Sequence, residues 1–142
     1  MDMRVAAYAV IRGEDGRILL AHWNEAGRSG WTMPGGGLEA GEDPEDAVRR
    51  EVREETGYRV RVEQLLGIHS QVIPEAHRVS PDADGPLHTL RILYSATITG
   101  GRLRHEVSGS TDRAAWFPAS DVRALHRVRL VDIALGMADV DY

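Results

Sequence analysis

Cysteine is absent from the 142-residue chain, which excludes disulfides, thiolate metal sites and cysteine nucleophiles. Any metal site must therefore use oxygen or histidine ligands, and a site of this kind favours hard ions such as Mg²⁺ or Mn²⁺. The chain also lacks an apolar run that approaches the roughly 18 residues of a membrane span. Its first ten residues show no cleavage pattern. We expect a cytoplasmic protein that neither spans a membrane nor is exported.

The chain also has no excess of positively charged residues. The formal net charge is −5, from 22 acidic residues against 17 lysines and arginines, and this balance argues against broad binding to a nucleic-acid backbone. The hydrophobic fraction of 42% and the charged fraction of 27% are ordinary for a globular protein. Because this length suits one domain with one core, we expect residues 1–142 to form a single domain.

Turn residues divide the chain into short apolar segments and two helical patterns. The expected strands cover residues 4–11, 17–21, 58–73, 87–99 and 114–117. We expect the turn at 13–16 to join the first two strands as a hairpin, and the polar segments 22–37 and 74–86 to be loops. A second helical pattern runs from residue 120 to 137. Strands and helices do not alternate strictly, so we predict an α/β fold with a mixed sheet flanked by helices.

The clearest helix signals lie at the two ends of one acidic segment. Asp43 suits the N-cap, Pro44 suits the first helical position, and Gly57 suits the stop after the last turn. Val48 and Val52 are one turn apart and form an apolar stripe on this helix. We therefore predict an amphipathic helix between the N-cap and the glycine.

Three glutamates on this helix, Glu51, Glu54 and Glu55, fall within one arc of roughly 100°. Like charges so placed weaken a helix by roughly 0.2–0.5 kcal/mol per pair, so something must offset the repulsion. A solvated surface helix with salt bridges is one explanation. A bound divalent cation is the other, and two features favour it. The glutamates border the apolar stripe, and the glycine-rich turn 34–37 precedes the helix, where the backbone can approach a phosphate or metal closely.

The segment from Gly36 to Tyr58 resembles the Nudix box. That signature reads glycine, five residues, glutamate, seven residues, then Arg-Glu-hydrophobic-any-Glu-Glu-any-Gly-hydrophobic. Every fixed position is met, with Glu42 and residues 50–57 in place, and Tyr58 stands where a bulky aliphatic residue is usual. The resemblance implies the Nudix fold, an α/β/α sandwich around a mixed β-sheet.

Nudix hydrolases cleave a nucleoside diphosphate linked to another group, using Mg²⁺ or Mn²⁺. The implied metal ligands are the main-chain carbonyl of Gly36 and the carboxylates of Glu51, Glu54 and Glu55. The implied catalytic residues are Glu54, Glu55 and Arg50, and Arg50 acts by holding a carboxylate in position. One of the glutamates, or an acid from a later loop, serves as general base. Glu42 is expected to be mainly structural and paired with Arg50.

Site residues outside the box carry a weaker signal. Glu106 and Asp112 precede Trp116, in a region where some Nudix enzymes supply an additional carboxylate, although a plain loop acid is the favoured interpretation of each. Trp31 and Trp116 are expected in the core or anchoring loops. The candidate substrate contacts are Trp23, Arg91 and Tyr94.

The leading functional interpretation is a MutT-like nucleoside triphosphate pyrophosphohydrolase, which acts on a nucleotide-type small molecule. One alternative is an ADP-ribose or nucleotide-sugar pyrophosphatase, for which Pro74, 16 residues beyond Tyr58, is a weak indication. A non-catalytic nucleotide-binding regulator is the other alternative, and the presence of all the metal glutamates disfavours it. The sequence does not decide between a monomer and the homodimer that is common in the family.

Overall fold

A computed structural model describes residues 1–142 and contains seven strands and two α-helices. The strands are β1 (Asp2–Ile11), β2 (Ile18–Glu25), β3 (Arg28–Thr32), β4 (Gly35–Gly37), β5 (Tyr58–Ile73), β6 (Leu87–Gly101) and β7 (Thr111–Phe117). The α-helices are α1 (Pro44–Thr56) and α2 (Arg129–Met137), and short 3-10 helices occur at η1 (Glu75–His77) and η2 (Ala119–Ala124). No helix is long and apolar enough to cross a membrane.

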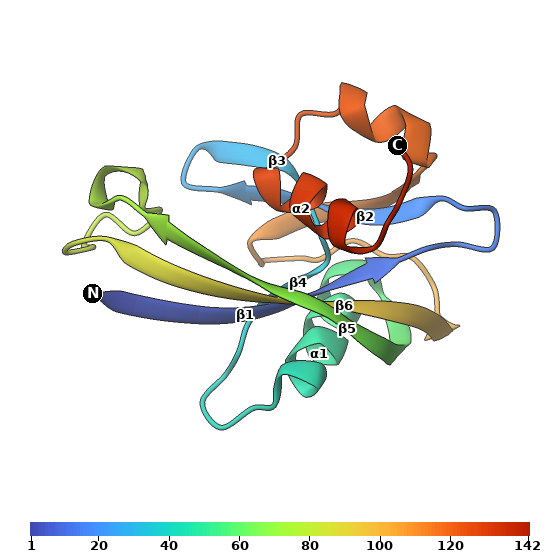
Figure 1. Ribbon diagram of the computed structural model, residues 1–142, viewed down its shortest axis with the longest axis horizontal. Helices are drawn as coiled ribbons and strands as arrows, with labels where there is room; N and C mark the ends of the chain where they lie inside the picture. The colour runs from blue at the N-terminus through green and yellow to red at the C-terminus, as the bar shows by residue number, and fades with distance from the viewer.

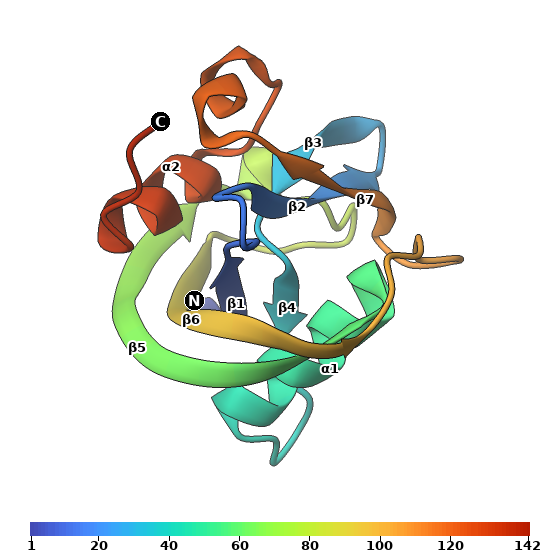
Figure 2. The same ribbon diagram turned by 90° about the vertical axis from the view of Figure 1, so that its right-hand side faces the viewer.

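The strands form two sheets. The larger sheet has the order β4-β1-β6-β5 and the smaller the order β3-β2-β7. Strands β1 and β6 are parallel and every other pair is antiparallel, so the predicted mixed sheet is confirmed. Helix α1 covers one face of the larger sheet, whereas the smaller sheet and α2 lie on its other side (Figure 1, Figure 2). These layers give the expected α/β/α sandwich.

Strand β1 is the centre of the core because residues 6–11 are buried on both faces of the sheet. Tyr8 and Val10 point into a cluster between the two sheets and α2. Ala7 and Ala9 point the other way, into a cluster under α1. This alternation follows from the two-residue period of a strand. Strand β1 therefore fixes both the glycine strand β4, which pairs with it, and the helix that carries the glutamates.

The predicted hairpin of the first two strands is wrong. The turn itself forms, since the Gly13 N–H donates to the Arg17 carbonyl at 2.8 Å. However, β1 and β2 join different sheets and share only the bridge between Arg12 and Ile18. Residues 6–11 of β1 and 18–21 of β2 are buried on both faces, and each strand lies between two other strands. A turn signal fixes where the chain reverses, but it does not fix which strands pair.

The predicted loop over residues 22–37 is also wrong, because the end of β2 and all of β3 and β4 lie within it. Its polar, glycine-rich composition hides these short strands. Glycine is required at Gly35, whose φ is +145° and where a Cβ would collide with the backbone of Ala7 and Tyr8. A three-glycine strand can thus lie directly against β1.

The helix predicted over residues 120–137 is broken into η2 and α2. Between them the chain is extended, because its backbone pairs with β3. The Trp31 N–H donates to the His126 carbonyl at 2.9 Å, and the Val128 N–H donates to the Trp31 carbonyl at 2.9 Å. Helical periodicity continues across this interruption, so the sequence pattern alone conceals it.

Helix α1 matches its prediction closely. Pro44 occupies the first turn, and Gly57 ends the helix in the left-handed conformation with φ of 84°. Val48 and Val52 are fully buried against the sheet, as the apolar stripe predicted. The one difference is at Asp43, whose side chain makes no capping hydrogen bond. Packing of the valine stripe therefore anchors this helix.

Replacing Val52 with alanine should lower the free energy of unfolding by about 1.5–3 kcal/mol, because two buried methyl groups are lost and a cavity remains. Urea denaturation monitored by circular dichroism measures this change. Val107→Ala is the matched control, since Val107 is 85% exposed, and should change stability by less than about 0.5 kcal/mol. Equal effects of the two substitutions would contradict the anchoring role of the stripe.

Candidate active site

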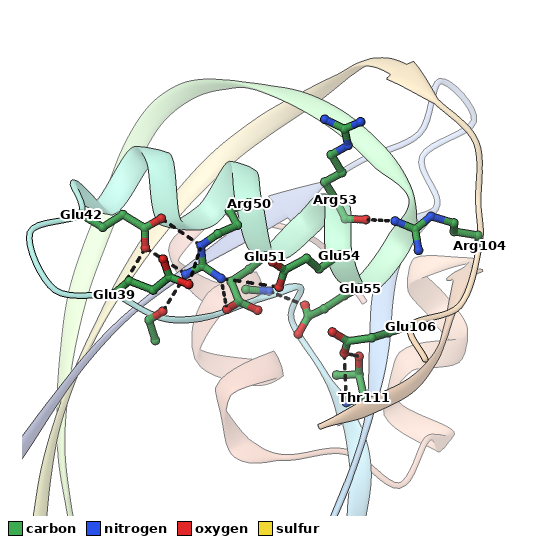
Figure 3. A network of polar contacts seen from close by, with 12 residues as sticks. Glu39, Glu42, Arg50, Glu51, Arg53, Glu54, Glu55, Arg104, Glu106 and Thr111 are labelled. Atoms are coloured by element: carbon green, nitrogen blue, oxygen red, sulfur yellow. Dashed lines mark hydrogen bonds and ion pairs between the residues drawn. The ribbon is translucent and has the colours of Figure 1, made fainter. Parts of the chain in front are cut away.

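The three box glutamates lie along the edge of α1 that faces β4 and the segment before β7 (Figure 3). Glu51 and Glu55 line a cavity of about 770 Å³. Glu54 is more open, with 49% of its side chain exposed. The helix therefore brings together three carboxylates that differ sharply in their contact with water.

Glu55 is the most buried of the three, at 3% exposed. Its Oε1 accepts a hydrogen bond from the Gly35 N–H at 2.8 Å. Burial raises the pKa of Glu55 well above the ordinary value, this single hydrogen bond opposes the shift, and the negative charges of Glu51 and Glu106 add to it. Glu55 is thus a desolvated carboxyl group held in a fixed position.

The carboxylate of Glu51 lies against the backbone of Gly36. A Cβ at Gly36 would stand 2.8 Å from Glu51 Cδ, so only glycine leaves room for this contact. Burial raises the pKa of Glu51, while a hydrogen bond from Arg50 opposes the shift. The first glycine of the box and its first helical glutamate therefore lie directly against each other.

Arg50 connects the glutamates with the loop before α1 (Figure 3). Its Nε and Nη2 each donate to one oxygen of Glu42 at 2.9 Å, and Nη2 also donates to the Gly37 carbonyl at 3.1 Å. Its Nη1 lies 2.8 Å from Glu51 Oε1 and 3.5 Å from Glu54 Oε2. One guanidinium thus positions a loop and offsets part of the repulsion among the glutamates.

The expected pair of Glu42 and Arg50 is present. Hydrogen bonds from Arg50 lower the pKa of Glu42 to about 2, and a backbone hydrogen bond from Glu39 adds to the effect. Glu42 in turn raises the pKa of Arg50. The geometry agrees with a supporting position for Glu42, because both of its oxygens are engaged by the same guanidinium.

Of the two later acids, the structure brings only Glu106 to the glutamates. Glu106 accepts a hydrogen bond from the Thr111 hydroxyl at 2.6 Å, and its carboxylate stands beside Glu55 (Figure 3). Asp112 lies on the smaller sheet instead. There it is bound by His22 Nδ1 at 2.8 Å and by Asn24 Nδ2 at 3.0 Å, bonds that lower its pKa. Asp112 is therefore engaged in a separate polar network.

Two of the three candidate substrate contacts lie at the cavity and the third does not. Trp23 and Arg91 line the cavity, but Tyr94 does not. Tyr94 is three residues beyond Arg91, so it points to the opposite face of β6, where it is buried in the cluster under α1. Arg4 also lines the cavity and is missing from the sequence-based set. Arg4 is four residues before Tyr8 on β1, an even spacing that places both side chains on the same face of the strand, and this was the available signal.

Two tryptophans expected to anchor the structure have such contacts. Trp31 is 9% exposed and packs edge-on against Phe117, with ring centroids 4.7 Å apart. Trp116 donates from Nε1 to the Tyr58 hydroxyl at 3.1 Å. This bond also explains how an aromatic residue is accommodated at the last position of the box.

Replacing Glu55 with glutamine should stabilise the metal-free protein at pH 8 and flatten its dependence on pH. A carboxyl whose pKa is raised by folding binds more protons in the folded than in the unfolded state. The wild type therefore loses stability as the pH rises from about 4.5 toward the raised pKa. Glutamine keeps an acceptor for the Gly35 N–H but carries no charge.

Urea denaturation between about pH 5 and pH 8, in the presence of EDTA, measures this difference. Glu45→Gln is the control on the same helix, because 56% of its side chain is exposed. A Glu55→Gln protein that is less stable than the wild type at pH 8 would refute the assignment of Glu55 as a destabilising buried acid.

Comparison with known proteins places this geometry in a family. A model of the NUDIX domain matches residues 2–134. The ADP-ribose pyrophosphatase of Methanocaldococcus jannaschii is 34% identical over 100 residues, which cover 70% of this chain and 54% of that protein. A MutT-like protein of Streptomyces ambofaciens is 46% identical over 65 residues, covering 46% of this chain and 41% of that protein.

Solved structures agree with the sequence relatives. The structure of a NUDIX hydrolase from Nitrosomonas europaea superimposes with a TM-score of 0.78 at 28% identity, covering 97% of this chain and 89% of that chain. The chain spans about half, or less, of the length of the two curated relatives.

Proposed function

The chain belongs to the Nudix family, and from this premise we propose that it is a divalent-metal-dependent hydrolase of the pyrophosphate bond in a nucleoside di- or triphosphate derivative. One observation carries the proposal: Glu51 and Glu55 line a cavity, and Glu51 rests on Gly36. Glu54 stands on the same edge of α1. Carboxylates grouped beside a cavity that admits a nucleotide are what hydrolysis of a phosphoric anhydride requires.

The donor chemistry of these residues fits Mg²⁺ or Mn²⁺. The carboxylates of Glu51, Glu54 and Glu55 and the Gly36 carbonyl are hard oxygen donors, which such ions prefer. Burial raises the pKa of both Glu51 and Glu55, so a cation bound beside them would stabilise their ionised forms. In the arrangement described, no three acidic or histidine side chains converge closely enough to enclose an ion. Arg50 supplies the countercharge instead.

The roles of the protein groups follow from their surroundings. A bound Mg²⁺ would neutralise phosphate oxygens and make a water molecule more acidic. Arg50 orients Glu51 through its 2.8 Å ion pair and restrains Glu54 more loosely at 3.5 Å. The proton of the attacking water needs an acceptor within hydrogen-bonding reach, and the candidates are Glu54, Glu55 and Glu106, whose carboxylates lie near one another in Figure 3.

The leading substrate class is the nucleoside triphosphates, as for a MutT-like enzyme. ADP-ribose or a nucleotide sugar is the second candidate, and the name of the relative from Methanocaldococcus jannaschii supports it. Both classes carry a pyrophosphate bond that water would attack at the proposed site. They differ in the number of phosphates, so the residues lining the rest of the cavity decide between them.

Replacing Glu54 with glutamine should reduce kcat by about 100-fold or more, because a ligand or proton acceptor is lost while the shape of the side chain is kept. Phosphate and pyrophosphate release with Mg²⁺ measures the rate, and Glu45→Gln is the control on the first turn of the same helix. Addition of EDTA should abolish wild-type activity, and excess Mg²⁺ should restore it. If Glu54→Gln and Glu55→Gln both keep full activity, the proposed function is wrong.

A panel of normal and oxidised nucleoside triphosphates, ADP-ribose, sugar nucleotides and dinucleoside polyphosphates should identify the substrate. We expect kcat/KM to be highest for a nucleoside triphosphate. A preference of more than about tenfold for ADP-ribose would instead establish the second candidate. If no member of the panel is hydrolysed, the chain is not the enzyme proposed.

A further inference from the structure

The larger sheet carries three partly buried polar side chains, each with one buried atom that has no hydrogen-bond partner inside the protein. The three buried side-chain atoms without a hydrogen bond are His69 Nδ1, Gln71 Oε1 and Arg91 Nη1. His69 is paired with Arg91, and Gln71 with Thr89, across the adjacent strands β5 and β6. Paired residues point to the same face, and this is the cavity face because Arg91 and Thr89 line the cavity. Buried polar groups are nearly always hydrogen-bonded, so these three atoms offer unused donor and acceptor capacity on the cavity face.

Positive charge collects at the same place without an acidic partner. None of the ion pairs of the chain includes Arg4 or Arg91. Arg4 is paired in register with Thr89 on the neighbouring strand, one step along the cavity face from Arg91. Burial lowers the pKa of Arg91, and the nearby charges of Arg4 and of Arg129, the first residue of α2, lower it further.

The other two arginines that line the cavity, Arg28 and Arg78, already have hydrogen-bond or ion-pair partners within the protein. Arg28 donates to the His77 carbonyl, and Arg78 pairs with Asp2 at 3.0 Å while donating to the Gly85 carbonyl at 3.0 Å. These two hold the loop between β5 and β6 in place. Arg4 and Arg91 have no comparable structural task.

Arg4 and Arg91, which have no acidic partner, lie on the larger sheet and line the same cavity as Glu51. Arg4 reaches toward β4, where a Cβ at Gly37 would stand 3.4 Å from its Nε. Gly37 follows the glycine that touches Glu51. Gly37 on β4 is paired with Ala6 on β1, and Ala6 is paired with Arg91 on β6. The Cα atoms of Gly37 and Arg91 are therefore two strand spacings apart, about 10 Å. The cavity therefore has an acidic end and a cationic end.

We propose that Arg4 and Arg91 bind a phosphate group of the substrate outside the bond that is hydrolysed. A ligand with three or more phosphates, such as a nucleoside triphosphate, would extend from the glutamates to these arginines. Planar guanidinium groups bind phosphate through charge-assisted, often bidentate hydrogen bonds, which suits a cluster of cations that lacks acids. This inference rests on the proposed function, of which it specifies the substrate class.

Substitution of Arg91 by methionine tests the subsite, because methionine keeps much of the length of the side chain and removes its charge. KM for a nucleoside triphosphate should rise about tenfold or more, the loss of one charge-assisted hydrogen bond. For ADP-ribose, which has only two phosphates, KM should change less than about twofold. Arg91→Lys should recover part of the loss, and Arg102→Met, an exposed arginine outside the cavity, should leave both substrates unchanged.

Binding of inorganic tripolyphosphate, measured by calorimetry, tests the subsite without turnover. Wild type should bind it at least about tenfold more tightly than Arg91→Met. The midpoint of thermal unfolding of Arg91→Met should equal or exceed that of wild type, because an uncompensated charge has left a partly buried site.

Two results would overturn the subsite. One is unchanged tripolyphosphate binding in Arg91→Met, and the other is an equal loss of activity on the two substrates. If wild type hydrolyses no nucleotide but tripolyphosphate binding depends on Arg91, the proposed function fails while the anion subsite is supported.

Discussion

The ion-pair network of Arg50 is the interaction on which the acidic site depends. Helix α1 turns three glutamates toward one edge, and their mutual repulsion requires a countercharge. A guanidinium has five N–H donors in a fixed fork, so one arginine can serve several acceptors at once. Arg50 uses this capacity on Glu42, Glu51 and the Gly37 carbonyl. Lysine, a single point charge, would not hold the same set of acceptors.

The packing of the core determines where the glutamates lie, through the contacts of strand β1. Strand β1 pairs with β4, and the cluster that holds Val48 and Val52 lies under the same strand. Gly36 therefore meets Glu51 at close range because β4 lies beside β1 within the sheet and α1 packs on one face of that sheet. Loosening the core would displace the carboxylates relative to the backbone that they touch. Packing and chemistry are thus linked by geometry.

Features coded by neighbouring residues were predicted well. The ends of α1, the valine stripe and the arc of glutamates all follow from contacts within four residues along the chain, and the structure contains each of them. The spacing of the box likewise lies within one segment. The sequence was therefore sufficient for the family and for the grouping of the three glutamates along one edge of α1.

Features that depend on partners far along the chain were not predictable in the same way. Strand β1 pairs with β6 through Ala6 and Arg91, residues separated by most of the chain, so the turn at 13–16 misleads about pairing. The failure at Tyr94 has a related cause. Alternation shows that Tyr94 and Arg91 point to opposite faces, but only the position of α1 shows which face is the cavity.

Arg4 and Glu51 line one cavity with opposite charges, yet they form no ion pair with each other. Flexible side chains on a loop would close such a gap, since oppositely charged groups attract strongly where water is partly excluded. Here the charges stand on paired strands and on a packed helix, and Arg50 already holds Glu51 at 2.8 Å. The rigid sheet thus keeps the acidic and cationic ends from neutralising each other. A ligand that carries both metal-binding and arginine-binding phosphates would satisfy both ends at once.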